Sequence, residues 1–102
     1  WHQRSCDLML GVPFNIASYA TLLLLLAKEA NLTPGILQGT FADCHIYENH
    51  MEGAEEQLLR NRNPLPIVDV GKFTCIYDWN SSDTILNNYN PHPKINFGPI
   101  AV

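Results

Sequence analysis

The feature that most constrains the fold is a run without charged side chains from Leu8 to Ala27. Its length matches the ~20 apolar residues that a transmembrane helix needs. Gly11 and Pro13 interrupt the run, however, and its unbroken apolar part, Leu22 to Ala27, is too short to cross a bilayer. Leucine fills every position from 22 to 26, so no face is polar. We therefore predict a helix that is enclosed by protein and does not span a membrane.

The segments around this run predict short strands and one further helix. Pro13 suits the first turn of a helix, because the N–H that it lacks has no partner there, and a helix is predicted over residues 14–30. A second helix is predicted from Asn49, with Glu52 completing a capping box. Strands are predicted over residues 1–10, 36–47, 67–70 and 84–88, and composition also favours a strand over 73–77.

Length and charge limit the class of protein. A chain of 102 residues has the size of one small domain. Charged residues make up 16%, below the usual level of about 25%, which suits a chain with much buried surface. The net charge is −4 and Lys and Arg together number 6. This argues against nucleic-acid binding, because neutralising phosphates requires clustered basic residues.

The cysteines indicate neither a disulfide framework nor a metal site. Cys6, Cys44 and Cys75 are odd in number, widely spaced and without a CxxC pair. Free thiols fit a reducing compartment, so we expect a cytoplasmic protein. His45 and His50 lack the spacing of a helical zinc pair, and no metal is expected.

The opening stretch, Gln3 to Asp7, concentrates hydrogen-bonding groups. Arg4 offers a bidentate fork and Ser5 a hydroxyl donor, a combination that can bind a phosphate. On a regular strand, Gln3, Ser5 and Asp7 face one way and Arg4 the other. A single phosphate site therefore requires a bent strand or a second subunit, and the alternative is a solvated strand end.

Three further positions suggest ligand contacts. The Asn15 amide has both a donor and an acceptor, as the edge of uracil requires, although it could instead bond to nearby backbone. His45 and Tyr47 would share a strand face and could hold a sugar hydroxyl, or be ordinary strand side chains. The apolar end at Ala101 and Val102 is either a tethered strand end or a flap over a ligand.

Taken together, several stretches resemble the thymidylate synthase family. The similarity covers most of the chain, is weakest over residues 71–88, and corresponds only to the C-terminal portion of that family's usual chain. The stretches are QRSCD at 3–7, LGVPFNIASYA at 10–20, HIYENH at 45–50, NPHPKI at 90–95 and PIAV at 99–102.

The resemblance implies that residues 1–102 are the C-terminal portion of a single thymidylate synthase domain. The implied fold class is α+β, with a large twisted mixed β-sheet packed against a long buried helix. It also implies a helical turn near residues 73–77, where composition favours a strand. The implied reaction methylates dUMP to dTMP, with 5,10-methylenetetrahydrofolate as cosubstrate supplying the carbon and the hydride. A homodimer that shares residues across its interface is implied.

The resemblance also assigns residues. Arg4 and Ser5 would bind the nucleotide phosphate, Asn15 would read the uracil edge, and His45 and Tyr47 would hold the ribose hydroxyl. The full set of implied dUMP contacts is Gln3, Arg4, Ser5, Cys6, Asp7, Asn15, His45 and Tyr47. The implied folate contacts are Asp7, Gly11, Ala101 and Val102, the last two in a flap that excludes water.

The chain departs from the family pattern at the nucleophile. The family uses as nucleophile a cysteine in a Pro-Cys-His stretch that precedes the QRS motif. The partner-subunit arginines that complete the phosphate site also precede this motif. None of the three cysteines here follows proline, so Cys6 is a pocket residue and not the nucleophile. The chain starts at Trp1, and we expect a preceding segment without which these residues do not catalyse. A lesser departure is His2, which stands where tyrosine is common.

Two other functions remain open from the sequence. One is a nucleotide-binding module that performs no chemistry. The other is a deoxycytidylate hydroxymethylase, a related enzyme that typically carries Asp at the position of Asn15. An amide at this position favours uracil over cytosine, which presents an exocyclic amine.

Overall fold

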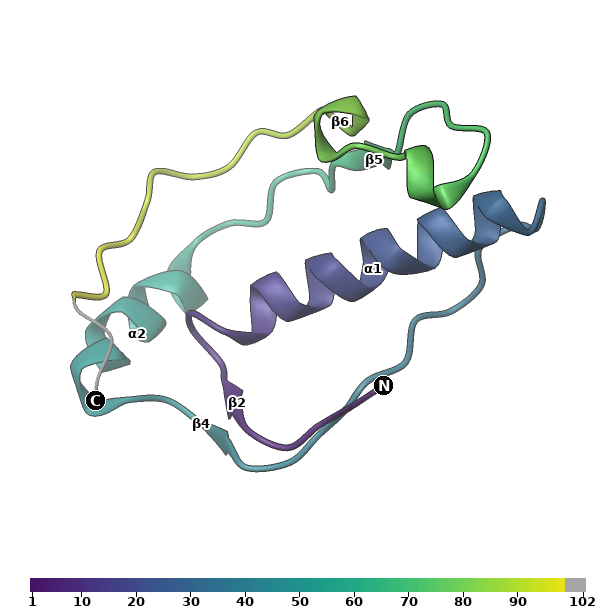
Figure 1. The fold of residues 1–102 in the computed structure, drawn as a ribbon. Helices are drawn as coiled ribbons and strands as arrows, with labels where there is room; N and C mark the ends of the chain where they lie inside the picture. Colours follow the sequence, from purple (N-terminus) through teal and green to yellow (C-terminus); the bar gives the residue numbers. More distant parts are fainter. Residues whose placement is uncertain (99–102) are drawn as a thin grey trace. The chain divides into compact units, whose positions relative to one another are not determined.

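The computed structural model describes residues 1–98, and the chain divides into two compact units. Unit 1 contains residues 1–15, 38–63 and the chain from 91 onward, whereas unit 2 contains 16–37 and 64–90. The longest element, α1 (Val12–Glu29), has its first turn in unit 1 and its remainder in unit 2 (Figure 1).

Unit 1 is built around two short parallel ladders. Strand β1 (His2–Gln3) pairs with β3 (Thr40–Phe41), and β2 (Cys6–Asp7) pairs with β4 (Cys44–His45). The Trp1 ring meets the Phe41 ring edge-on, with 5.4 Å between centroids, which covers one end of the first ladder. A bend at residues 4–5 separates β1 from β2, and Asp43, with a φ of 42°, lies between β3 and β4.

The chain then forms a single helical turn, η1 (Glu48–His50), and the helix α2 (Met51–Leu59). The segment from residue 91 is tied to the end of α2, because Arg60 Nη1 donates to the Pro93 carbonyl at 2.7 Å. His50 is fully buried between Tyr47 and Phe97, whose ring centroids lie 5.6 and 5.4 Å from its own. Aromatic packing therefore joins the β4 end of unit 1 to its C-terminal segment.

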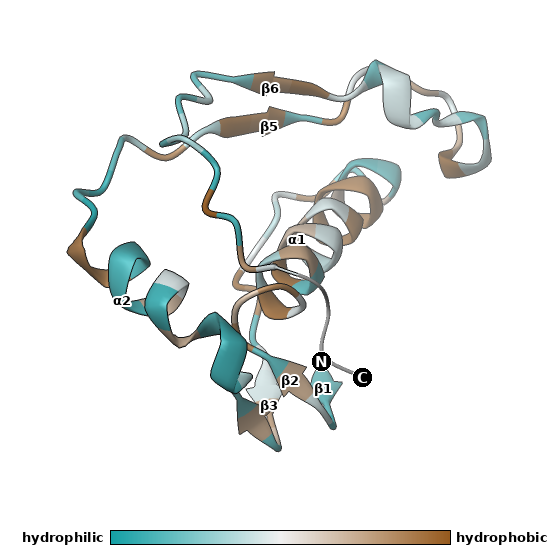
Figure 2. Ribbon diagram, turned by 90° about the vertical axis from the view of Figure 1, so that its left-hand side faces the viewer, coloured by the Kyte–Doolittle hydropathy of each residue, from teal (hydrophilic) through white to brown (hydrophobic). Residues whose placement is uncertain are grey.

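Unit 2 contains the body of α1 and an antiparallel ladder formed by β5 (Ile67–Asp69) and β6 (Ile85–Asn87). Figure 2 shows these two hydrophobic strands side by side. Two short turns, η2 (Ile76–Asp78) and η3 (Ser81–Asp83), lie between them in the sequence. The connection is fastened to the end of α1, since Ile76 N donates to Glu29 Oε2 at 2.8 Å and Lys28 Nζ donates to the Gly71 carbonyl.

The described residues do not form the predicted large sheet. They make three ladders of two strands each, two parallel and one antiparallel. The combination of helices and strands is therefore confirmed, and the large twisted mixed sheet is not, because each ladder is purely parallel or purely antiparallel. The predicted strand over residues 36–47 is reduced to β3 and β4, because the left-handed Asp43 interrupts it.

The predicted enclosure of the long helix is also wrong for this chain. Phe14 is 74% exposed and Leu26 51%, while Val12, Leu25 and Ala27 are buried. Figure 2 shows hydrophobic residues along the length of the helix. The described residues pack against only part of this surface. No helix within residues 1–98 is long and apolar enough to cross a bilayer.

Two local predictions have different outcomes. The capping box at Asn49 and Glu52 is not formed, because α2 begins after His50 and neither η1 nor α2 has a side-chain cap. The helical turn implied near residues 73–77 is found as η2, and the strand favoured there by composition is wrong. Composition failed at this point because apolar residues alone do not distinguish a strand from a short turn.

The glycines at 71 and 98 give a matched test of unit 2, because both have a φ of +76°. A Cβ at Gly71 would lie 2.5 Å from the Asp83 carbonyl oxygen, whereas one at Gly98 would meet nothing within 4 Å. Gly98→Ala should cost at most about 1–2 kcal/mol of unfolding free energy, the cost of the left-handed backbone. Gly71→Ala should cost about 1–3 kcal/mol more, because backbone must move. Urea unfolding of both variants measures the difference, and equal losses would contradict the packing at Gly71.

Candidate functional site

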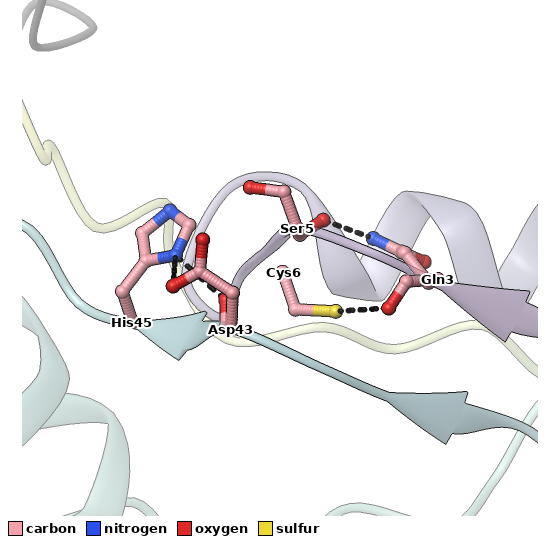
Figure 3. A network of polar contacts seen from close by, with 5 residues as sticks. All are labelled: Gln3, Ser5, Cys6, Asp43 and His45. Carbon is pink, nitrogen blue, oxygen red and sulfur yellow. Dashed lines mark hydrogen bonds and ion pairs between the residues drawn. The ribbon is translucent and has the colours of Figure 1, made fainter.

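The bend at Arg4 and Ser5 changes how the opening stretch presents its side chains. These residues belong to neither β1 nor β2, and both are exposed. Gln3 Nε2 donates to the Ser5 carbonyl at 3.1 Å and closes the bend (Figure 3). The strict alternation that would put Arg4 and Ser5 on opposite faces is therefore lost. The bend removes the objection to one anion site formed by both residues.

The same Gln3 amide links the bend to the start of α1. Its Nε2 also donates to Asn15 Oδ1 at 2.8 Å. The Asn15 side chain is therefore held by another side chain, and this bond is not the local backbone bond that the sequence left open as an alternative. One amide group thus fixes both the bend and the Asn15 carboxamide.

Asp7 orders the turn that leads from β2 into α1. Its Oδ1 accepts from Met9 N at 3.1 Å and from Leu10 N at 3.3 Å, and its carbonyl accepts from Gly11 N at 3.1 Å. A Cβ at Gly11 would lie 3.2 Å from the Asp7 carbonyl oxygen and 3.8 Å from Asn15 Oδ1. Asp7, Gly11 and Asn15 therefore line one side of the entry to the helix.

His45 is brought to this region by the β2–β4 ladder, in which it pairs with Asp7. Its Nδ1 lies 2.9 Å from the Asp43 carbonyl oxygen and 3.6 Å from the Asp43 carboxylate (Figure 3). The Tyr47 ring meets the His45 ring edge-on, with 5.2 Å between centroids. The two rings thus lie together, as their spacing predicted, and Asp43 sets the orientation of the imidazole.

Cys6 lies at the buried centre of the group. It is 0% exposed, and its thiol donates to the Gln3 carbonyl at 3.5 Å. Burial raises the pKa of the Cys6 thiol, and the neighbouring Cys44 raises it further. A buried thiol with a raised pKa reacts poorly with molecules that arrive from solvent.

These contacts define a group that we call the β2–β4 polar cluster. Arg4 lies in the bend but is not counted in the cluster, because its guanidinium makes no hydrogen bond or ion pair with the residues that the structure describes. Asp43 was not predicted as a site residue, and its spacing of two from His45 was the only signal. Ala101 and Val102 lie outside the described residues. The cluster consists of Gln3, Ser5, Cys6, Asp7, Gly11, Asn15, Asp43, His45 and Tyr47.

Two grooves of the described surface lie in unit 2, and no cluster residue lines them. One of about 560 Å³, between the end of α1 and β5, is lined by Lys28, Asn31, Asp69 and apolar neighbours. It contains none of the predicted residues, so we place the candidate site at the hydrogen-bonded cluster. Within residues 1–98, no three His, Cys, Asp or Glu side chains are grouped so that they could hold a metal ion.

The described residues thus form an α+β chain in which polar side chains from separate stretches of the sequence are joined in one cluster. The family model for thymidylate synthase matches residues 1–102. The chain is 50% identical to a thymidylate synthase of Staphylococcus haemolyticus over 101 residues, 99% of this chain and 31% of that protein. It is 48% identical to a thymidylate synthase of Mycoplasma pneumoniae over 101 residues, 99% of this chain and 35% of that protein.

The chain therefore belongs to the thymidylate synthase family. It spans about a third of the length of these two relatives.

The two acceptor bonds of Asp7 predict a specific effect on stability. Asp7→Ala removes the acceptor for Met9 N and Leu10 N, and should lower the free energy of unfolding by about 1 kcal/mol. Asp7→Asn keeps an acceptor oxygen at the same place and should retain most of this free energy of unfolding. Equal losses in the two variants, measured by urea unfolding, would show that the charge of Asp7 matters and its acceptor geometry does not.

Proposed function

We propose that the protein acts as a thymidylate synthase, which methylates dUMP to dTMP with 5,10-methylenetetrahydrofolate as the donor of carbon and hydride. The observation that carries this proposal is the family match over all 102 residues. The β2–β4 polar cluster supports it, because residues from three separate stretches of the sequence are joined there by hydrogen bonds, strand pairing and ring contacts.

In this proposal the cluster and the adjoining Arg4 bind different parts of dUMP. Arg4 and Ser5 hold the phosphate from the bend, as a guanidinium and a hydroxyl can do together. Asn15 reads the uracil edge, with its orientation set by Gln3 at 2.8 Å. His45 and Tyr47 hold the ribose hydroxyl, and Gln3, Cys6 and Asp7 line the same pocket.

Folate would be held on the side of the cluster where β2 enters α1. Asp7 and Gly11 contribute contacts there, and the absence of a side chain at Gly11 keeps the approach to Asp7 and Asn15 open. Ala101 and Val102 form a terminal flap that closes over the folate and excludes water from reactive intermediates.

The chain binds and orients the reactants, and the nucleophile comes from another part of the protein. Cys6 is buried and has a raised pKa, which does not suit attack on a substrate that arrives from solvent. We propose that residues 1–102 are the C-terminal portion of one thymidylate synthase domain. The protein would be a cytoplasmic homodimer with residues shared across its interface.

The fold of the complete domain follows from the same proposal. A ladder of two strands has edges to which further strands can pair, so the β1–β3 and β2–β4 ladders would extend into a large twisted sheet. The exposed Phe14, Leu22 and Leu26 of α1 would be covered by the remainder of the domain. Burial of such side chains contributes roughly 1.5–3 kcal/mol each.

The role of Asn15 is tested by Asn15→Asp in the full-length protein. Asp keeps the acceptor for Gln3 Nε2 but removes an amide donor, so the uracil edge is mispaired. The ratio of kcat/KM for dUMP to that for dCMP should fall about 10- to 100-fold, as expected when a buried polar group loses its partner. Steady-state kinetics with both nucleotides measure the ratio.

Asn87→Asp is the matched control, because it makes the same change on the exposed strand β6. It should leave the ratio unchanged. An unchanged ratio in Asn15→Asp would refute base reading by Asn15, and a wild-type preference for dCMP would favour deoxycytidylate hydroxymethylase.

Deletion of Val102 tests the flap. Turnover should fall by at least about 10-fold while the Kd for dUMP changes little, because the flap would act on closure and not on nucleotide binding. Val102→Ile, which keeps the chain length, serves as the control. Steady-state kinetics and nucleotide titration separate the two effects, and normal turnover after deletion would exclude the flap role.

A further inference from the structure

The fold sets two cysteines directly opposite each other, although they are far apart in the sequence. Cys6 and Cys44 are register partners in the parallel β2–β4 ladder. Cys6 N donates to the Asp43 carbonyl at 3.1 Å, and Leu8 N donates to the His45 carbonyl at 3.0 Å. The register is therefore fixed by bonds to the residues on both sides of Cys44.

This position meets the Cα-spacing requirement for a disulfide. Neighbouring strands lie about 4.8 Å apart, and disulfides bridge Cα atoms separated by about 4.4–6.8 Å. Side chains of directly opposed residues lie on the same side of a ladder. The register pairing of Cys6 with Cys44 therefore brings the two side chains side by side.

The two thiols differ in access to reagents. Cys44 is exposed, whereas Cys6 is 0% exposed. A reagent in solution therefore meets Cys44 first, and Cys6 can react only through its neighbour. Cys75 is half-buried in unit 2 and shares no ladder with either, so it serves as an internal control.

We propose that Cys6 and Cys44 form a dithiol site that reacts with low-molecular-weight disulfides and closes to a disulfide between β2 and β4. The Cys44 thiolate attacks one sulfur of the small disulfide, forming a mixed disulfide and releasing one thiolate. Cys6 then attacks the Cys44 sulfur and passes its proton to the leaving thiolate. The Cys6–Cys44 bond forms, the bond between Cys44 and the small molecule breaks, and the second small thiol is released. The protein dithiol is oxidised by two electrons, and one small disulfide is reduced to two thiols.

Closure would change the β2–β4 polar cluster. The Cys6 thiol hydrogen now donated to the Gln3 carbonyl would be lost. The new bond would lie beside the Asp7–His45 pair of the same ladder. This site is independent of the proposed enzyme activity, since it rests only on strand register and thiol exposure.

The sequence allows a direct test by peptide mapping. Each cysteine falls on its own tryptic peptide: 5–28 for Cys6, 29–60 for Cys44 and 73–94 for Cys75. The full-length protein is incubated with oxidised glutathione under native conditions, blocked with N-ethylmaleimide and digested without reductant. Mass spectrometry should find peptides 5–28 and 29–60 joined, with peptide 73–94 carrying the maleimide.

Variants of the exposed and control cysteines sharpen this result. Cys44→Ser should leave Cys6 unmodified by glutathione, and Cys75→Ser should leave the Cys6–Cys44 crosslink at its wild-type yield. Because Cys44 is exposed, its replacement is compatible with the fold. Glutathione retained on Cys44 with Cys6 free would overturn the proposal, as would a crosslink of either thiol to any other cysteine.

Discussion

The pairing of β2 with β4 is the interaction on which the candidate site depends. Its register places Asp7 opposite His45 and Cys6 opposite Cys44. Without it, the Asp7 turn and the His45–Tyr47 ring pair would be unrelated parts of the chain. Two strands of two residues each supply little binding energy of their own. The cluster is therefore maintained by this ladder together with the side-chain bonds of Gln3 and Asp7 and the aromatic contacts of His50.

Interruptions in the strands matter as much as the pairing. The bend at Arg4 and Ser5 and the left-handed Asp43 each end one ladder and start the next. Asp is among the few residues other than glycine that adopt this backbone conformation readily. A polar group makes a contact at each interruption. The Gln3 side chain donates to the Ser5 carbonyl in the first bend, and the Asp43 carbonyl contacts the His45 ring at the second. Continuous strands would have kept the alternation of faces that separates Arg4 from Ser5.

Much of the local structure could be predicted from the sequence, and its limits are physical. Pro13 and the leucine run predicted α1 well, because helix signals are local. The shared position of His45 and Tyr47 also followed from spacing. The link between Gln3 and Asn15 could not be foreseen, since it depends on how a bend meets a helix. The placement of Cys6 opposite Cys44 depends on the register between β2 and β4, which cannot be predicted from the sequence of either strand alone.

The failure to predict the exposure of α1 has a different origin. Five consecutive leucines cover every face of the helix, which indicates that it prefers an apolar environment on all sides. Periodicity says nothing about which part of a protein provides that environment. In the described residues several apolar side chains of this 18-residue helix stay exposed, whereas the hydrogen bonds of the polar cluster need only nearby partners. Polar site geometry is therefore satisfied locally, while burial of the apolar helix requires surface that these residues do not supply.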